Sequence, residues 1–170
     1  MIDYGDRARL GILVPSGNTV AEPELRAMLP SGVGMSVARL PLVGSSEAEL
    51  RAMIDRLEEE AVLVGHAKPD RIAFHCTAVS TFAPHWADDI RTRIQGATGI
   101  PAFATADGIV AALRTFAVRR AILVTPYIQP VHDREIAWLR SLGVETVGGA
   151  SMGVNTNTEM ARISPADLAG

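Results

Sequence analysis

Cys76 is the single cysteine in a sequence of 170 residues, and its surroundings favour a chemical role. A free cysteine is more often just a small buried apolar side chain. Here, however, it ends a predicted buried strand, Arg71–Cys76, and Thr77-Ala78-Val79-Ser80 follows. Backbone amides at such a turn would lower the thiol pKa toward the thiolate, which can act as a nucleophile or a base. The side chain of His75 is expected on the opposite face of the strand, so no Cys–His dyad is predicted.

Two further polar segments follow predicted strands in the same way. These are Pro15-Ser16-Gly17-Asn18-Thr19 and Thr125-Pro126-Tyr127. In an open parallel sheet, ligands bind beyond the carboxyl ends of the strands, so the three segments should converge on a small polar pocket. Its backbone amides and helix N-termini would favour an anion, most simply a carboxylate.

Single residues of these segments have a structural and a chemical interpretation. Asn18 either caps the following helix or points its amide at a substrate carboxylate. Tyr127 is either a packed aromatic residue or a hydrogen-bond donor to an anion or enolate oxygen. Asn155 and Asn157 are turn residues or pocket amides, and their spacing does not choose between these roles.

The remaining histidines and the tryptophans do not indicate a metal or cofactor site. His66, His85 and His132 lack the spacing of metal ligands and are expected mostly at the surface. Trp86 and Trp138 lie within helical patterns, which favours packing over stacking on a cofactor. The sequence therefore shows no metal signature.

The pattern of apolar residues predicts the elements that position these side chains. Strands are expected at Arg9–Val14, Val33–Leu40, Arg71–Cys76, Ile100–Ala104, Arg120–Pro126 and Val144–Val147. Helices are expected at Val20–Leu29, from a cap at Ser45 or Ser46 to about Val64, at Pro84–Ile94, after a cap at Thr105 or Asp107, and at about Val131–Leu142. This alternation predicts an α/β fold with a parallel sheet flanked by helices.

The pattern restarts after an offset of about 110 residues. The segment around Ile122 resembles the segment around Ile12, and Gly143 precedes its strand as Gly32 does. We therefore expect two similar lobes, at residues 1–104 and 105–170. On this interpretation the second lobe is incomplete, because the counterpart of Cys76 would lie past Gly170, and a helix that opens at Ser164 is cut short. A truncated chain is the expectation.

Composition excludes several classes of protein. The 16 Lys and Arg residues against 19 Asp and Glu residues, without a basic run, argue against a nucleic-acid partner. One cysteine excludes an intramolecular disulfide and fits a reducing compartment, so the predicted location is the cytoplasm. No apolar run has the length of a signal peptide core or a membrane span, and no membrane partner is expected.

Taken together, three motifs resemble a known family. They are Gly11-Ile12-Leu13-Val14-Pro15-Ser16-Gly17-Asn18-Thr19, Cys76-Thr77-Ala78-Val79-Ser80 and Thr125-Pro126-Tyr127. The set resembles the maleate cis-trans isomerase and arylmalonate decarboxylase branch of the Asp/Glu racemase superfamily. The resemblance runs from about Arg9 to the end of the chain. It implies two flavodoxin-like lobes related by a pseudo-twofold axis, an active site between them, no cofactor and a homo-oligomer.

The resemblance also implies roles for individual residues. Cys76 is similar to the first-lobe cysteine that adds to C2 of a cis-enedioate such as maleate, after which the C2–C3 bond rotates and elimination gives the trans acid. The substrate-binding residues it implies are Ser16, Asn18, Thr77, Ala78, Tyr127 and Asn157, with Asn155 as an alternative to Asn157. Selectivity would depend on loops such as Pro41–Ser46.

One departure from the family pattern leaves alternatives open. The isomerases carry a second cysteine in the second lobe, and this sequence has none. The decarboxylases lack the first cysteine, so Cys76 favours an isomerase or racemase over an arylmalonate decarboxylase-like enzyme. A truncated, inactive carboxylate-binding module is a further alternative. A flavin-binding flavodoxin-like protein is a weaker one, because no aromatic residues are placed to sandwich the ring. A nicotinamide enzyme is disfavoured, because Gly32-Val33-Gly34 precedes its strand.

Overall fold

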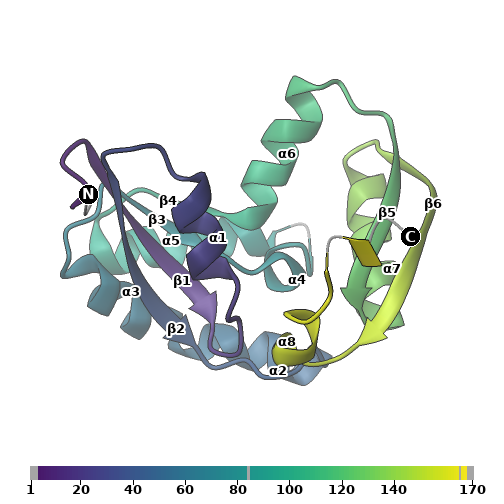
Figure 1. The fold of residues 1–170 in the computed structure, drawn as a ribbon, viewed down its shortest axis with the longest axis horizontal. Coiled ribbons are helices and arrows are strands. Elements are labelled where there is room, and N and C mark those ends of the chain that lie inside the picture. Colours follow the sequence, from purple (N-terminus) through teal and green to yellow (C-terminus); the bar gives the residue numbers. More distant parts are fainter. Residues whose placement is uncertain (1–3, 84, 165, 168–170) are drawn as a thin grey trace.

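The computed structural model describes residues 4–83, 85–164 and 166–167, which form two parallel sheets (Figure 1). The strands of the first sheet are β1 (Ala8–Pro15), β2 (Val33–Leu40), β3 (Arg71–Phe74) and β4 (Ala102–Ala104), in the order β2-β1-β3-β4. The second sheet pairs β5 (Arg120–Tyr127) with β6 (Glu145–Val154). This arrangement confirms the predicted α/β class with parallel sheets flanked by helices. The division into lobes at residue 104 stays a prediction.

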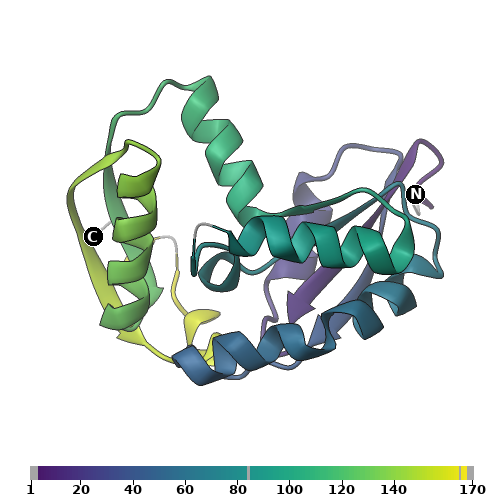
Figure 2. The same ribbon diagram turned by 180° about the vertical axis from the view of Figure 1, so that it is seen from behind.

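Helices cover both faces of the first sheet (Figures 1 and 2). The helices of the chain are α1 (Ala21–Met28), α2 (Glu47–Ala52), α3 (Leu57–Gly65), α4 (Thr77–Ser80), α5 (Trp86–Thr98), α6 (Thr105–Thr115), α7 (Gln129–Ser141) and α8 (Asn157–Met160), with a 3-10 turn at Met53–Arg56. Successive side chains of β1 point to opposite faces, so Ile12 and Val14 pack with Ala21 of α1, whereas Leu13 joins the larger core formed with α3 and α5. None of the helices in the described residues is long and apolar enough to cross a membrane.

The second sheet is reached through α6 and packs on α7 (Figure 1). On the side that faces α7, Thr125 is buried and Leu123 is partly buried, while Ile122, Val124 and Val147 on β5 and β6 are exposed. The chain then returns to the first sheet, where α8 lies beside α2. There the side chain of Asn155 accepts hydrogen bonds from the backbone amide and the hydroxyl of Ser45, at 3.1 and 3.0 Å. These two residues are separated by the same 110 positions as the predicted repeat.

Helix caps agree with the sequence signals. Ser46 caps α2, because its hydroxyl accepts the amide of Glu49 while the Glu49 carboxylate accepts the amide of Ser46. Asp107 accepts the backbone amide of Ala104 at the start of α6. Ser164 accepts the amide of Asp167, as expected of a cap, whereas residues 165 and 168–170 lie outside the described residues.

Some element boundaries were predicted wrongly. The third strand ends at Phe74 rather than Cys76, and a short helix, α4, begins immediately after Cys76. The helix expected from Pro84 begins at Trp86, and Pro84 itself lies outside the described residues. The last strand continues to Val154 because its glycines permit a bulged, exposed extension that an apolar run does not signal.

Candidate active site

A cavity of about 240 Å³ lies where β1, β3 and β5 end. It is lined by Pro15, Asn18, Val20, Leu42, Gly44, Ser45, Leu50, His75, Cys76, Thr77, Ala78, Pro126, Tyr127, Asn157, Met160 and Ala161. The three polar segments therefore converge, as their positions after parallel strands predicted. The loop after β2 and helix α8 complete the wall.

Cys76 occupies the N-terminal end of α4 and is 8% exposed. Burial raises the pKa of its thiol to about 12, because a thiolate there loses its hydration. The backbone amides of Val79 and Ala78 donate toward the sulfur and lower the pKa, whereas the charge of Glu135 raises it. The prediction of a lowered pKa is therefore wrong: the expected amides are present, but the effect of burial on the pKa is larger.

Tyr127 ends β5 and lines the cavity together with Thr77. Burial raises the pKa of its phenol well above the usual range, and the nearby charges of Glu135 and Cys76 act in the same direction. A hydrogen bond with the side chain of Thr77 opposes this shift. The hydroxyl therefore keeps its proton at neutral pH and can donate a hydrogen bond.

Asn18 takes the capping role that the sequence allowed, while its role toward a substrate carboxylate stays a prediction. Its Oδ1 accepts the amides of Val20 and Ala21, at 3.1 and 2.9 Å, and so caps α1. The same side chain lines the cavity. Ser16 is not among the lining residues, and its hydroxyl bonds the backbone amide and carbonyl of Leu42, at 3.1 and 3.3 Å. Ser16 thus holds the loop after β2 against the end of β1.

Of the two asparagines near α8, Asn157 lines the cavity and Asn155 does not. The Nδ2 of Asn157 donates to the carbonyl of Leu42 at 3.1 Å, and its backbone amide donates to Val43 at 3.1 Å. The close approach of α8 depends on Gly17, because a Cβ there would lie 3.0 Å from the Cβ of Asn157. Sequence patterning did not single out Gly17 for this reason.

Two buried polar residues of α7 lie near the site. His132 is 4% exposed and its Nδ1 lies 2.9 Å from the hydroxyl of Thr125, so its expected place at the surface is wrong. Glu135 is 6% exposed, and burial raises its pKa to about 7. The sequence reasoning missed Glu135, although an acidic residue at an apolar position of the helix was a usable signal. No cluster of three His, Cys, Asp or Glu side chains suited to a metal occurs among the described residues.

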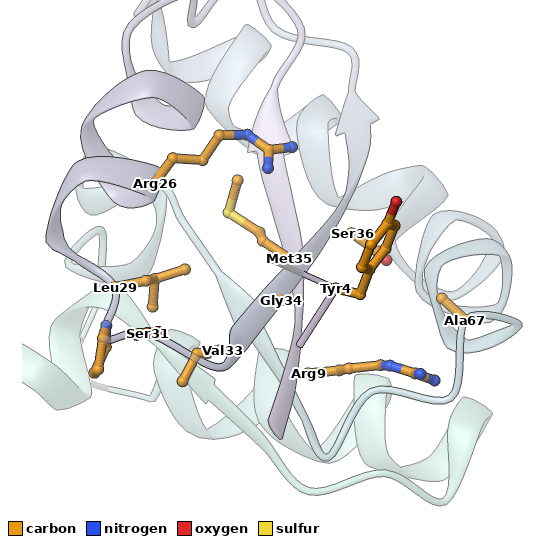
Figure 3. A pocket seen from close by; sticks show the side chains of 11 residues that line it. Tyr4, Arg9, Arg26, Leu29, Ser31, Val33, Gly34, Met35, Ser36 and Ala67 are labelled. Atoms are coloured by element: carbon orange, nitrogen blue, oxygen red, sulfur yellow. The ribbon is translucent and has the colours of Figure 1, made fainter. Parts of the chain in front are cut away.

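A larger cavity of about 640 Å³ lies at the opposite end of the first sheet (Figure 3). Tyr4, Arg9, Arg26 and Met35 line it, together with the loop between α1 and β2. It has no cysteine, histidine or carboxylate in its lining and lies at the amino ends of β1 and β2. Size alone would favour it, but its position and its residues favour the smaller cavity as the active site.

Comparisons with known proteins point in the same direction. A sequence profile described as arylmalonate decarboxylase matches residues 10–170. A maleate isomerase from Geobacillus stearothermophilus is 25% identical over 174 residues, which cover 94% of this chain and 69% of that relative.

Two solved structures superpose closely. A cysteine-to-alanine variant of the maleate isomerase Iso from Pseudomonas putida S16, with maleate, has a TM-score of 0.88 at 21% identity and covers 95% of this chain and 70% of its own. The second is a cysteine-to-serine variant of the Nocardia farcinica maleate cis-trans isomerase with a covalently bound succinylcysteine intermediate. It has a TM-score of 0.86 at 24% identity, and the match covers 92% of this chain and 68% of that chain. At these identities the two structures establish a shared fold.

Proposed function

This chain belongs to the arylmalonate decarboxylase family, and on that premise we propose that it is a cofactor-independent isomerase that converts maleate, or a similar small cis-enedioate, into the trans acid. The observation that carries the proposal is the position of Cys76, a thiol in a small cavity beside Tyr127, Asn18 and Asn157. The maleate isomerases among its relatives, one with a succinylcysteine intermediate, support the same chemistry.

The size and lining of the cavity suit a small diacid. About 240 Å³ is below the usual volume of sites for drug-sized ligands, so a four-carbon substrate fits better than a large aromatic acid. The amides of Asn18 and Asn157 and the hydroxyls of Thr77 and Tyr127 offer hydrogen-bond donors to carboxylate oxygens. We propose these residues and the backbone at Ala78 as the substrate contacts. Ser16 acts indirectly, through the loop after β2.

The proposed reaction uses one thiolate and needs no external oxidant or reductant. The Cys76 sulfur forms a bond to C2 of maleate while the C2=C3 π electrons move onto C3 and its carboxylate, which gives an enediolate. The C2–C3 single bond rotates, the electron pair returns to form the trans double bond, and the S–C2 bond breaks. Tyr127 stabilises the enediolate by donating a hydrogen bond to its oxygen.

Thiolate formation is the demanding step in this sequence. The thiol pKa of about 12 leaves little thiolate at neutral pH. The backbone amides of Ala78 and Val79 stabilise the Cys76 thiolate, and the thiolate then reacts with the electron-poor alkene. The rate of isomerisation should therefore rise with pH.

A second cysteine, which the resemblance implies for the isomerases, does not occur in this sequence. The addition, rotation and elimination above balance without it, because the enediolate need not be protonated before it collapses. An arylmalonate decarboxylase-like activity is the second candidate, and the family profile favours it.

The test is incubation of the purified chain with maleate, followed by proton NMR for fumarate. Wild type, Cys76→Ala and Cys76→Ser are compared, with phenylmalonate as the decarboxylase substrate in a parallel assay. The proposal predicts fumarate from the wild type alone. Equal turnover by Cys76→Ala, or carbon dioxide release from phenylmalonate without isomerisation, would overturn it.

A further inference from the structure

Glu135 is a buried acid without a matching cation. It lies on α7, is 6% exposed, and its Oε1 has no hydrogen-bond partner among the described residues. The described ion pairs do not include it. Burying an ionised, unpaired carboxylate is costly, so the surroundings favour the neutral acid.

One hydrogen bond opposes this effect, because the contact with Thr81 lowers the pKa of the Glu135 carboxyl, although burial has the larger influence. The hydroxyl of Thr81 donates to the carbonyl of Thr77 at 2.9 Å and is also hydrogen bonded to the Glu135 carboxyl. A hydroxyl has one proton to give, so Thr81 donates either to the carbonyl of Thr77 or to the Glu135 carboxyl. If Glu135 ionises, Thr81 has to turn its proton away from the first residue of α4.

This acid lies close enough to the reactive groups to affect them. A charge on Glu135 raises the pKa of both Cys76, at the start of α4, and Tyr127, at the end of β5. The Thr77–Thr81 turn that Glu135 contacts is also the turn whose amides donate to the Cys76 sulfur. Charge and geometry therefore link Glu135 to the same thiol.

The other titratable groups nearby do not neutralise Glu135. His132, one turn earlier on α7, has its Nδ1 at the hydroxyl of Thr125. Arg134 lies with its guanidinium 4.3 Å from the centre of the Phe82 ring and 3.5 Å from the carboxylate of Glu47 on α2. Glu135 is left to interact mainly with Cys76, Tyr127 and Thr81.

We propose that Glu135 is a positioning residue for Cys76, one that stays protonated while the thiolate forms and suppresses the thiolate when it ionises. This inference deepens the proposed function and rests on it, since it assigns the control of the nucleophile to a residue of helix α7. Burial places the pKa of Glu135 near 7, so the control would operate around neutral pH. Below that pH the neutral acid permits a thiolate beside it, and above that pH two negative charges compete.

Cys76 is the single thiol of the sequence, so its alkylation by iodoacetamide reports this effect without any substrate. The rate is measured from about pH 5.5 to 9 in wild type, Glu135→Gln and Asp133→Asn. Asp133 is an exposed acid on the same helix whose carboxylate bonds Gln129, so its variant controls for a simple change of charge.

The expected result is a ratio of rates that changes with pH. Glu135→Gln and wild type should react alike at the acidic end, and the variant should react about 3- to 10-fold faster above pH 8, the size expected from removing a neighbouring like charge. Asp133→Asn should follow wild type throughout. A constant ratio for Glu135→Gln at every pH would indicate a packing change and overturn the proposal.

A second measurement on the unaltered protein covers the case in which Glu135→Gln does not fold. Carboxyl ¹³C NMR of glutamate-labelled wild type should show one glutamate that titrates near pH 7, apart from the rest. A titration in which every glutamate falls near its ordinary value would overturn the proposal.

The two proposals fail in different ways. If the protein isomerises maleate but the ratio of the Glu135→Gln and wild-type alkylation rates does not change with pH, the proposed role of Glu135 is refuted and the proposed function stands. If this ratio of alkylation rates changes with pH but maleate is not isomerised, the role of Glu135 toward the thiol stands and the proposed function is refuted.

Discussion

Replacing Glu135 with glutamine should make the folded protein less sensitive to alkaline pH. The pKa of this carboxyl rises from its ordinary value of 4.5 to about 7 on folding, chiefly because burial disfavours the charged form. The folded state therefore holds a proton that the unfolded state releases, and stability falls as pH increases between these values. From about pH 5 to pH 8 the loss should be about 2 to 3 kcal/mol, since each tenfold change in the ionisation constant is worth about 1.4 kcal/mol.

Urea unfolding followed by circular dichroism at both pH values measures this change. Wild type, Glu135→Gln and Asp133→Asn are compared, and the quantity of interest is the pH-dependent change in the free energy of unfolding of each protein. Groups such as Glu49 and Glu58, whose pKa values are lowered, contribute equally to all three and cancel. Asp133→Asn should match wild type, and Glu135→Gln should lose the alkaline destabilisation. An identical pH dependence in Glu135→Gln would refute the reasoning.

Three further substitutions probe the site and the fold. Gly17→Ala places a Cβ 3.0 Å from the Cβ of Asn157, so α8 should shift outward. The KM for maleate should then rise several-fold in steady-state assays, while the free energy of unfolding falls by only about 1 kcal/mol. An unchanged KM would show that the position of α8 does not affect substrate binding. Tyr127→Phe removes the hydroxyl but keeps the ring, so kcat should fall by about 10²-fold with little change in the melting temperature. Full activity of this variant would show that the hydroxyl takes no part in the reaction. Gly149→Ala forces a side chain onto a backbone with φ +149 and within 1.8 Å of the Leu123 carbonyl oxygen. The substitution should therefore lower the free energy of unfolding in urea by more than about 3 kcal/mol. A wild-type unfolding midpoint would show that the backbone at this position relaxes freely.

The strand framework was predictable because its signals are local. The buried runs around Ile12 and Ile72 are continuous and apolar, which is typical of strands covered on both faces, and Ser46 with Glu49 is a capping box that the sequence displays directly. The convergence of Asn18, Cys76 and Tyr127 followed from the rule that parallel strands present their carboxyl ends at one edge.

The parts that were missed depend on contacts between distant segments. Helix α4 has one turn and is too short for a periodic signal, so Cys76 was assigned to a strand end. The burial of His132 and Glu135 depends on how α7 packs in the folded protein, and the one local signal of it was an acidic residue at an apolar position of the helix. For the same reason the balance between burial and amide donors at Cys76 could not be judged before the cavity was known.

The central claim is that the Cys76 sulfur adds covalently to the substrate. It is tested most directly by mass spectrometry of the chain quenched in acid during turnover of maleate, because acid protonates the enediolate and traps it as S-succinylcysteine. The account predicts one succinyl group on the peptide that contains Cys76, formed as fast as fumarate appears or faster. Steady fumarate production without any adduct at Cys76 would contradict it.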